Sequence, residues 1–393
     1  MTGNQAEQVL RGRERAPSAS YMELFFDLAF IFSLTELTRV LLVDLSVGGA
    51  LRFLLLLAAM WWVWTVTAWS TDWFDPEQRF VRALLAWVMI GILLQAVALT
   101  RAFGPEALVF AGTYVAIHLG RGAGLAYRLR GHPAARRSAR VAIWFVITGV
   151  AWIVGALVPA ARHPLWAVAI VIDGTIGLFG YPVPGLGRST QAELRVSGEH
   201  FSERFGQFVI VAIGELILMS SLAIREVGFH PASTVAFVLS FINALLFTQI
   251  YHLPLGRGLP AFMEESRTPG RTALISGYLH YLLLAGILTA SAGNVLVIEH
   301  AGGPGQIRYS LVVVVGAAVF LAWRIVLLFA AAGRAAWWRA LALVAVLAVV
   351  PATARLHPVT ATAGVDLVLF ATGLAEGARA RRDLGKPAWR SAS

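Results

Sequence analysis

Residues 23–37 read Glu23-Leu-Phe-Phe-Asp27-Leu-Ala-Phe-Ile-Phe-Ser-Leu-Thr-Glu36-Leu. They belong to an apolar stretch that continues to residue 43, opens with charge and carries a carboxylate deep inside. An acidic side chain at membrane depth is costly, so it usually marks a functional site with a partner nearby. The stretch therefore predicts a membrane-spanning helix with functional acids.

A second stretch follows the same pattern and reads Glu203-Arg204-Phe-Gly-Gln207-Phe-Val-Ile-Val-Ala-Ile-Gly-Glu215-Leu. With one residue skipped, the two stretches can be aligned. The aligned polar positions are Glu23 with Glu203, Asp27 with Gln207, and Glu36 with Glu215. This correspondence indicates an internal duplication.

The composition of the whole chain is that of a membrane protein. Hydrophobic residues make up 58% of the 393 residues and charged residues 14%, whereas soluble domains carry roughly 25% charged residues. The mean hydropathy is +0.70. Cysteine is absent, which excludes disulfides and thiolate chemistry. The first apolar run is too long for a cleavable signal peptide, so we expect it to be a retained helix.

A helix needs about 20 apolar residues to cross the hydrocarbon core. The sequence predicts about twelve such spans, at 23–43, 51–71, 82–100, 106–127, 141–159, 164–183, 203–224, 231–253, 272–296, 307–331, 337–356 and 359–376. The expected fold is therefore an all-α polytopic membrane protein.

The charges between the spans predict the orientation. With a cytoplasmic N-terminus, 23 basic residues fall in the inner loops and termini and 6 in the outer loops. Basic residues concentrate on the cytoplasmic side of membrane proteins. We therefore expect both termini in the cytoplasm, and we do not interpret the net charge of +10 as nucleic-acid binding.

The longest polar connection divides the predicted spans into two groups of six, which predicts parallel repeats. The expected segments are a cytoplasmic N-terminal segment, the first half, a cytoplasmic linker, the second half and a basic cytoplasmic tail, at 1–20, 21–184, 185–202, 203–376 and 377–393.

Helical spacing places the polar residues on defined faces, at about 100° per residue. Glu23 and Asp27 share one face of the first span, and Glu36 lies on nearly the opposite face. Further polar residues lie inside the spans or at their ends: Arg121, His200, Glu203, Arg204, Gln207, Glu215, His280 and Arg324. Together with the three acids, they are the predicted ion, proton or substrate pathway.

A buried arginine is as costly as a buried acid. We therefore expect acids of the first span to face Arg121, and Glu203 or Glu215 to face Arg324. Glu23 and Glu203 also stand in first turns, where acids interact favourably with the helix dipole. A role in capping is an equal alternative for these two.

No known catalytic or cofactor motif occurs in the sequence. It contains no His-Glu-x-x-His, no Gly-x-Ser-x-Gly and no phosphate-binding Gly-x4-Gly-Lys-Ser/Thr, and no His and carboxylate cluster with metal-ligand spacing. The sequence predicts neither a cofactor nor a metal.

Several segments between residues 20 and 330 resemble the bacterial low temperature requirement protein A (LtrA) family. They are Glu23 to Phe32, Trp64-Thr-Val-Thr-Ala-Trp69, His200-Phe-Ser-Glu203-Arg204-Phe-Gly206 with Gly214-Glu215, and Tyr278-Leu-His280-Tyr281 with Ala285-Gly286-Ile287. The resemblance implies a bacterial, multi-pass protein of the inner membrane. It implies little about activity, because the family is named for a growth phenotype at low temperature. Gln207 departs from the family, which typically has a hydrophobic residue there.

Three classes of function fit these observations. The first is a proton- or cation-linked transporter or permeation protein, with Glu36 and Glu215 binding the ion and arginines competing for the carboxylates. The second is an enzyme acting on a lipid-linked substrate with His200, Glu203 and Arg204, although the sequence favours a non-enzymatic role. The third is a structural or sensory membrane protein.

The expected partners are membrane lipids and an unknown small solute or ion, without nucleic acid. Oligomerisation is suggested by Gly120-x3-Gly124, since small residues allow helices to approach closely.

Overall fold

The computed structural model describes residues 10–11, 19–190, 193, 196–252, 269–303, 306–332, 337–353 and 357–382. Within these residues the secondary structure is helical, apart from isolated bridges between Leu10 and Phe74 and between Val183 and Gly187. The expectation of an all-α protein is confirmed for this part of the chain.

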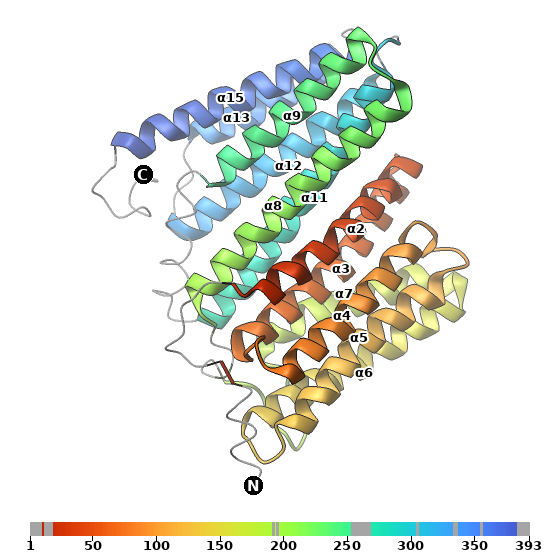
Figure 1. Cartoon of the computed structure of the whole chain (residues 1–393), viewed down its shortest axis with the longest axis vertical. Helices are drawn as coiled ribbons and strands as arrows, with labels where there is room; N and C mark the ends of the chain where they lie inside the picture. The colour runs from red at the N-terminus through yellow and green to blue at the C-terminus, as the bar shows by residue number, and fades with distance from the viewer. Residues whose placement is uncertain are drawn as a thin grey trace. The chain divides into compact units, whose positions relative to one another are not determined.

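The first helices alternate with short connections (Figure 1). They are α2 (Tyr21–Val43), α3 (Val47–Trp73), α4 (Arg79–Ala98), η1 (Leu99–Arg101), α5 (Ala107–Arg128), α6 (Ala134–Leu157), η2 (Pro159–Ala161), α7 (Arg162–Thr175) and η3 (Ile176–Phe179).

The remaining helices continue the same pattern. They are α8 (Gly198–Val227), α9 (Pro231–His252), α11 (Pro269–Glu299), α12 (Ile307–Ala332), α13 (Trp337–Ala348), α14 (Val350–Thr353) and α15 (Pro358–Arg382).

Every predicted span falls on at least one helix, but the helices differ in length. Among the described residues, eight are long and apolar enough to cross a membrane. α7 has 14 residues and α13 has 12, which at 1.5 Å per residue gives about 21 Å and 18 Å against a core of roughly 30 Å. The protein is thus a multi-helix membrane protein, while twelve spans and a duplication stay predictions.

Apolar side chains on the outer faces of the helices agree with a lipid environment. Phe25 of α2, Ile90 and Val97 of α4, and Val150 of α6 are each more than half exposed. Soluble monomers rarely expose large contiguous apolar patches. In a bilayer these side chains contact lipid.

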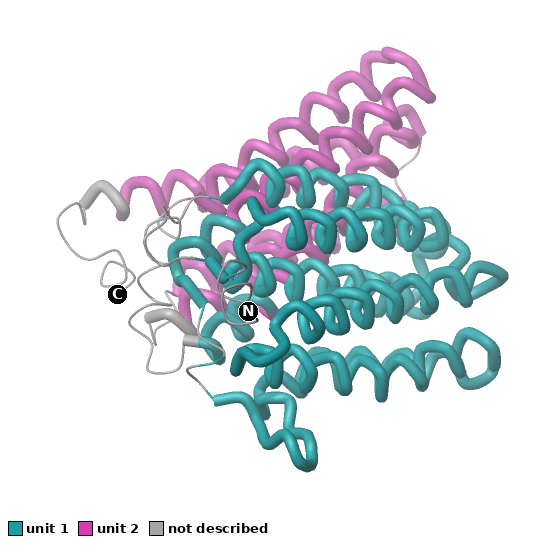
Figure 2. The backbone as a smooth tube through the Cα atoms, turned by 60° about the horizontal axis from the view of Figure 1, so that its bottom comes forward, with its two compact units in different colours: residues 1–204, 263–277 teal, residues 205–262, 278–393 magenta. Residues whose placement is uncertain are grey.

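The described chain forms two compact units, which Figure 2 colours separately. Unit 1 comprises Met1–Arg204 and Met263–Gly277, and unit 2 comprises Phe205–Phe262 and Tyr278–Ser393. α8 and α11 each contribute to both units. The predicted segment boundaries stay predictions.

The start of α2 is fixed by local hydrogen bonds. The Ser20 hydroxyl accepts from the Glu23 amide at 3.3 Å, and the Ser20 amide donates to Glu23 Oε2 at 2.8 Å. This capping box satisfies donors that have no partner within the helix. It also sets the position of the Glu23 side chain.

Small residues allow α5 to pack closely in unit 1. A Cβ added at Gly120 would lie 2.4 Å from Trp87 Nε1 of α4, and one at Gly124 would lie 3.0 Å from a Leu84 methyl carbon. The Gly120-x3-Gly124 pair therefore serves contacts within the chain. It provides no reason to expect oligomerisation, which stays a prediction.

In unit 2, glycines bring α11 and α12 together. A Cβ at Gly293 would lie 2.6 Å from the Val313 amide nitrogen, and one at Gly316 would lie 2.4 Å from the Ala290 amide nitrogen. Such backbone contact is typical of helix pairs in membranes, where small residues maximise van der Waals packing.

Candidate functional site

Two carboxylates of α2 form the centre of a buried polar network in unit 1. Glu23 and Asp27 are one helical turn apart, and their exposed fractions are 0% and 1%. On α8, His200 and Arg204 have the same spacing and are exposed by 2% and 0%. Glu23 binds His200 and Asp27 binds Arg204, and in each case 177 positions of sequence separate the two residues.

Glu23 belongs to a cluster of four charged or titratable groups. Its Oε1 lies 3.0 Å from His200 Nε2 and 3.6 Å from Arg11 Nη1. The other ring nitrogen of His200, Nδ1, lies 3.1 Å from Asp72 Oδ1. His200 therefore bridges two carboxylates, and its Nε2 also lies 2.9 Å from Arg11 Nη1. The protonated ring can donate to both carboxylates, whereas a ring without a proton on Nε2 can accept there from Arg11.

Asp27 binds two donors through one oxygen. Its Oδ1 accepts from Arg204 Nη2 at 2.7 Å and from Trp64 Nε1 at 2.8 Å. The indole of Trp64 stacks on Trp61, with ring centroids 4.7 Å apart, and the Arg204 guanidinium carbon lies 5.8 Å from the Trp64 ring centroid. Two indole rings thus lie beside the buried ion pair.

The Asp27–Arg204 pair is incompletely satisfied. Among the described residues, Asp27 Oδ2 has no hydrogen-bond partner, and neither have Arg204 Nε and Nη1. Buried charged groups normally have all their polar atoms bonded, because an unmet one costs about 1–3 kcal/mol or more. These atoms are therefore available to a proton, a water molecule or a solute.

The sequence analysis named these four residues as candidates, and it expected Arg121 to face the first-span acids. The expected pairing of first-span acids with Arg121 is wrong, because Arg204 binds Asp27. Arg121 instead donates to Thr67 Oγ1 at 2.8 Å and lies 2.7 Å from His118 Nδ1.

Three other predicted residues are less deeply buried. Glu36 is half-buried and pairs with Arg39, one turn further along α2, at 3.6 Å. Glu203 and Gln207 are both half-buried. Glu36 therefore lacks the deep burial that a central ion-binding acid needs.

Unit 2 contains the predicted Glu215 and His280. Glu215 is 0% exposed, and its Oε1 accepts from Ser291 of α11 at 3.3 Å. His280 stacks on Phe205 with centroids 4.0 Å apart, and its Nε2 lies 3.2 Å from the Tyr251 hydroxyl. Both residues are buried, as the sequence pattern suggested.

Arg324 pairs with an acid that sequence reasoning did not single out. Its Nη2 lies 2.6 Å from Glu376 Oε2, and Arg339 Nε lies 3.1 Å from Glu376 Oε1. The expectation of Glu203 or Glu215 as the partner did not include this acid. One carboxylate on α15 binds two guanidinium groups.

Sequence reasoning also missed two buried aspartates. Asp173 of α7 accepts hydrogen bonds from Tyr114, Thr148 and Trp152 at 2.9, 2.6 and 3.3 Å. Asp366 of α15 accepts from Asn243 at 2.8 Å. Each is an acid within a predicted span, so the rule that selected Glu36 could have found them.

The described residues include no group of three or more His, Cys, Asp or Glu side chains arranged to hold a metal ion. The carboxylates, guanidinium groups and imidazole of the network can transfer protons and exchange ionic partners.

Comparisons with known proteins agree with the earlier resemblance. Residues 18–374 match the family model described as bacterial low temperature requirement A protein. The chain is 34% identical over 315 residues to the uncharacterized protein RA0937 of Rhizobium meliloti (strain 1021). The aligned region covers 77% of this chain and 75% of that protein. No solved structure matches significantly. The chain therefore belongs to the bacterial low temperature requirement A (LtrA) family.

Proposed function

We propose that this chain is a proton-linked transporter of the bacterial cytoplasmic membrane, in which Asp27 binds the proton. The observation that carries the proposal is the fully buried Asp27–Arg204 pair, in which one carboxylate oxygen and two guanidinium nitrogens have no hydrogen-bond partner among the described residues. Acids within membrane segments commonly form proton relays in transporters.

The unbonded oxygen suggests how the first step occurs. A proton on Asp27 Oδ2 breaks no existing hydrogen bond, because both donors bind Oδ1. It removes the negative charge that compensates Arg204, so the guanidinium is left buried without its counter-ion. Protonation thereby favours a different arrangement of the first turns of α8 and α2.

The neighbouring pair offers Arg204 a second partner. Glu23 lies one turn before Asp27, a rise of about 6 Å along the helix, and it is held by His200 and Arg11. A shift of Arg204 toward Glu23 changes the partners of His200. Asp27 and Glu23 then serve in succession as the partner of Arg204. His200 is able to exchange a proton between Glu23 and Asp72.

The same geometry favours a proton over a metal cation. Arg204 stands 2.7 Å from Asp27 Oδ1, and a fixed positive charge at that distance repels a second cation strongly in a low-dielectric site. A proton can bind covalently to the free oxygen without displacing the guanidinium.

The enzyme alternative finds less support in the geometry. It needs His200, Glu203 and Arg204 to converge on a substrate. His200 and Arg204 are instead engaged with Glu23 and Asp27, and Glu203 is half-buried. These contacts tie the groups to the protein.

The excess of basic residues in the predicted inner loops supports a topology with both termini in the cytoplasm. In this orientation, the Glu23–His200 end of the network lies near the cytoplasmic surface and Asp27 lies one turn deeper.

The test is proton flux into vesicles. The purified full-length chain is reconstituted in liposomes that contain a pH-sensitive dye, and a panel of cations, amines, neutral solutes and organic anions is added outside. We expect at least one solute class to drive proton movement with the unmodified chain, and Asp27→Asn to abolish it.

Glu36→Gln is the matched control, because Glu36 is an acid of the same helix that is half-buried and paired with Arg39. It should keep most of the flux. Equal flux in the unmodified chain and Asp27→Asn, or no flux above that of empty liposomes with any solute, would refute the proposal. The second outcome would favour a structural or sensory role.

A further inference from the structure

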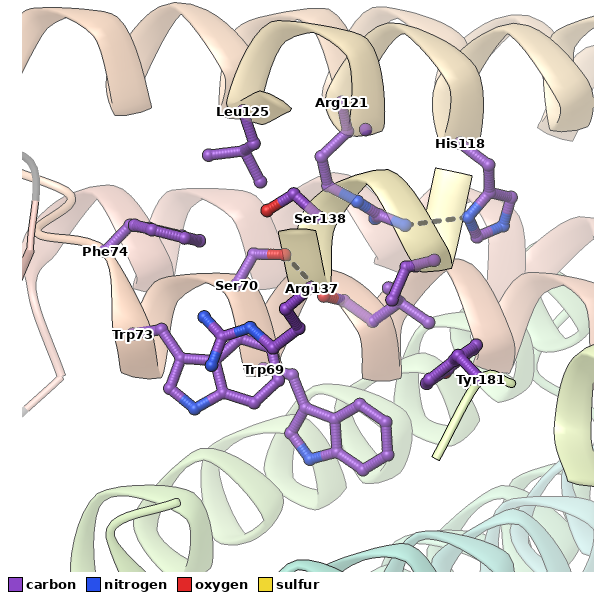
Figure 3. Close-up of a pocket in the computed structure, with 13 residues that line it drawn as sticks. Trp69, Ser70, Trp73, Phe74, His118, Arg121, Leu125, Arg137, Ser138 and Tyr181 are labelled. Carbon is purple, nitrogen blue, oxygen red and sulfur yellow. Dashed lines mark hydrogen bonds between the residues drawn. The ribbon is translucent and has the colours of Figure 1, made fainter. Parts of the chain in front are cut away.

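A small cavity in unit 1 lies apart from the carboxylate network (Figure 3). About 40 Å³ of it is open to a water molecule, and roughly 10–15 Å³ is enough to hold one water. Its walls come from the C-terminal end of α3, the second half of α5 and the N-terminal end of α6. Arg121 and Arg137 both line it, together with Trp69 and Trp73.

Arg121 is a buried cation without an acidic partner. It is 4% exposed, and its two hydrogen-bonding neighbours among the described residues are Thr67 and His118, both uncharged acceptors in this geometry. His118 accepts from the guanidinium through Nδ1, so its proton is on Nε2, which has no partner among the described residues. The remaining N–H groups of Arg121 are left for the cavity.

Arg137 approaches from the opposite wall, and its nearest acids, Glu193 and Asp72, also bind other cationic or titratable groups. Its guanidinium stacks 3.6 Å above the Trp73 ring, and Nη1 donates to the backbone oxygen of Glu193 at 2.5 Å. The nearest acids are already occupied. Glu193 binds Arg140 through its carboxylate at 2.5 Å, and Asp72 binds His200 at 3.1 Å.

The lining of this cavity contains no aspartate or glutamate. Two guanidinium groups in a buried space without an acid have a high cost, which an anion can offset. Arginine binds carboxylates and phosphates through paired, charge-assisted hydrogen bonds. The indoles of Trp69 and Trp73 provide an apolar wall beside the charges.

We propose that this cavity binds the carboxylate or phosphate group of an organic anion, with Arg121 and Arg137 holding the charged group and Trp69 and Trp73 contacting its apolar body. The proposal rests on the cavity alone and does not require transport. If transport also occurs, an organic anion is the solute that it would move.

Binding is measured by calorimetry on the full-length protein in nanodiscs of phosphatidylcholine. The probes are benzoate and phenyl phosphate, and benzyl alcohol is the neutral control. We expect both anions to bind and benzyl alcohol to bind much more weakly. Arg121→Met and Arg137→Met should each weaken anion binding about ten- to hundredfold, the worth of one charged hydrogen bond.

Arg136→Gln is the matched control, because Arg136 is exposed and adjacent to Arg137 on α6 but does not line the cavity. It should bind the anions like the unmodified chain. Arg121→Lys keeps the charge and should bind better than Arg121→Met, which separates charge from folding. Arg137→Met tests the same cavity through a side chain of a different helix.

Nanodiscs that contain phosphatidylglycerol distinguish the sources of the anion. Competition with benzoate identifies a lipid headgroup as the occupant, and no competition identifies a free organic anion; both support the proposal. Equal binding of benzyl alcohol, unchanged anion affinity in both Met variants, or no anion binding at millimolar concentration would overturn it.

Discussion

Replacing Asp27 and Arg204 singly and together measures how strongly the buried pair couples α2 to α8. Asp27→Leu leaves a guanidinium that is 0% exposed without its counter-ion, which typically costs about 3–5 kcal/mol of unfolding free energy. Arg204→Leu leaves a buried carboxylate held by Trp64 alone, and we expect a similar loss.

The double variant removes both charges. Its main remaining cost is that the Trp64 indole N–H loses its acceptor on Asp27, which costs about 1–3 kcal/mol. We therefore expect the double variant to be more stable than either single variant. Its loss of stability should differ from the sum of the two single losses by several kcal/mol, whereas the effects of independent sites add within about 0.5 kcal/mol.

The assay is reversible unfolding of the chain from lipid-like micelles with a denaturing detergent, followed by helical circular dichroism. Asp27→Asn serves as a milder reference, because an amide oxygen can still accept from Trp64 and Arg204. Additive single effects would show that the two side chains do not form a buried pair, contrary to the 2.7 Å contact between them.

Two further predictions concern unit 2. Glu376→Leu should destabilise the chain by about 3–5 kcal/mol, because Arg324 and Arg339 lose a shared carboxylate; Glu376→Gln keeps the shape but also removes the charge, so it should cost nearly as much, and a Gln variant as stable as the unmodified chain in the same unfolding assay would contradict an ionic role. Gly316→Ala should cost about 1–3 kcal/mol by overpacking, since the added carbon meets backbone at 2.4 Å. Gly214→Ala faces open space in its helix and should be neutral or slightly stabilising, so equal effects of the two alanines would argue against close contact of α11 with α12.

Hydropathy predicted where the helices lie, because a bilayer demands a fixed length of apolar residues. It could not predict where those helices stop. α7 ends after 14 residues, and the span expected at 337–356 is divided between α13 and α14. Polar and proline residues inside an apolar run, such as Asp173 and Pro351, indicate only weakly where a helix ends.

The four residues of the buried network were named from the sequence one by one, but their pairing was not predicted. Spacing along α2 and α8 placed Glu23 with Asp27 and His200 with Arg204, because one helical turn fixes those relations. The match between the two helices depends on tertiary packing over 177 positions. Assuming that ion pairs form within each predicted half led to the wrong partner for Asp27.

Burial was the second quantity that sequence could not supply. Glu36 and Asp173 are both acids within apolar runs, yet Glu36 is half-buried beside Arg39 while Asp173 is 2% exposed and bound by three neutral donors. Which face of a helix points inward depends on its neighbours. Hydropathy alone does not distinguish these two acids.

Infrared difference spectroscopy of the carboxyl groups tests most directly whether Asp27 takes up a proton inside the protein. Acidification of the full-length chain in nanodiscs should produce a protonated-carboxyl band that is missing from the Asp27→Asn spectrum and present in that of Glu36→Gln. An unchanged band in Asp27→Asn would mean that the buried pair never exchanges a proton, and that the proposed coupling is wrong.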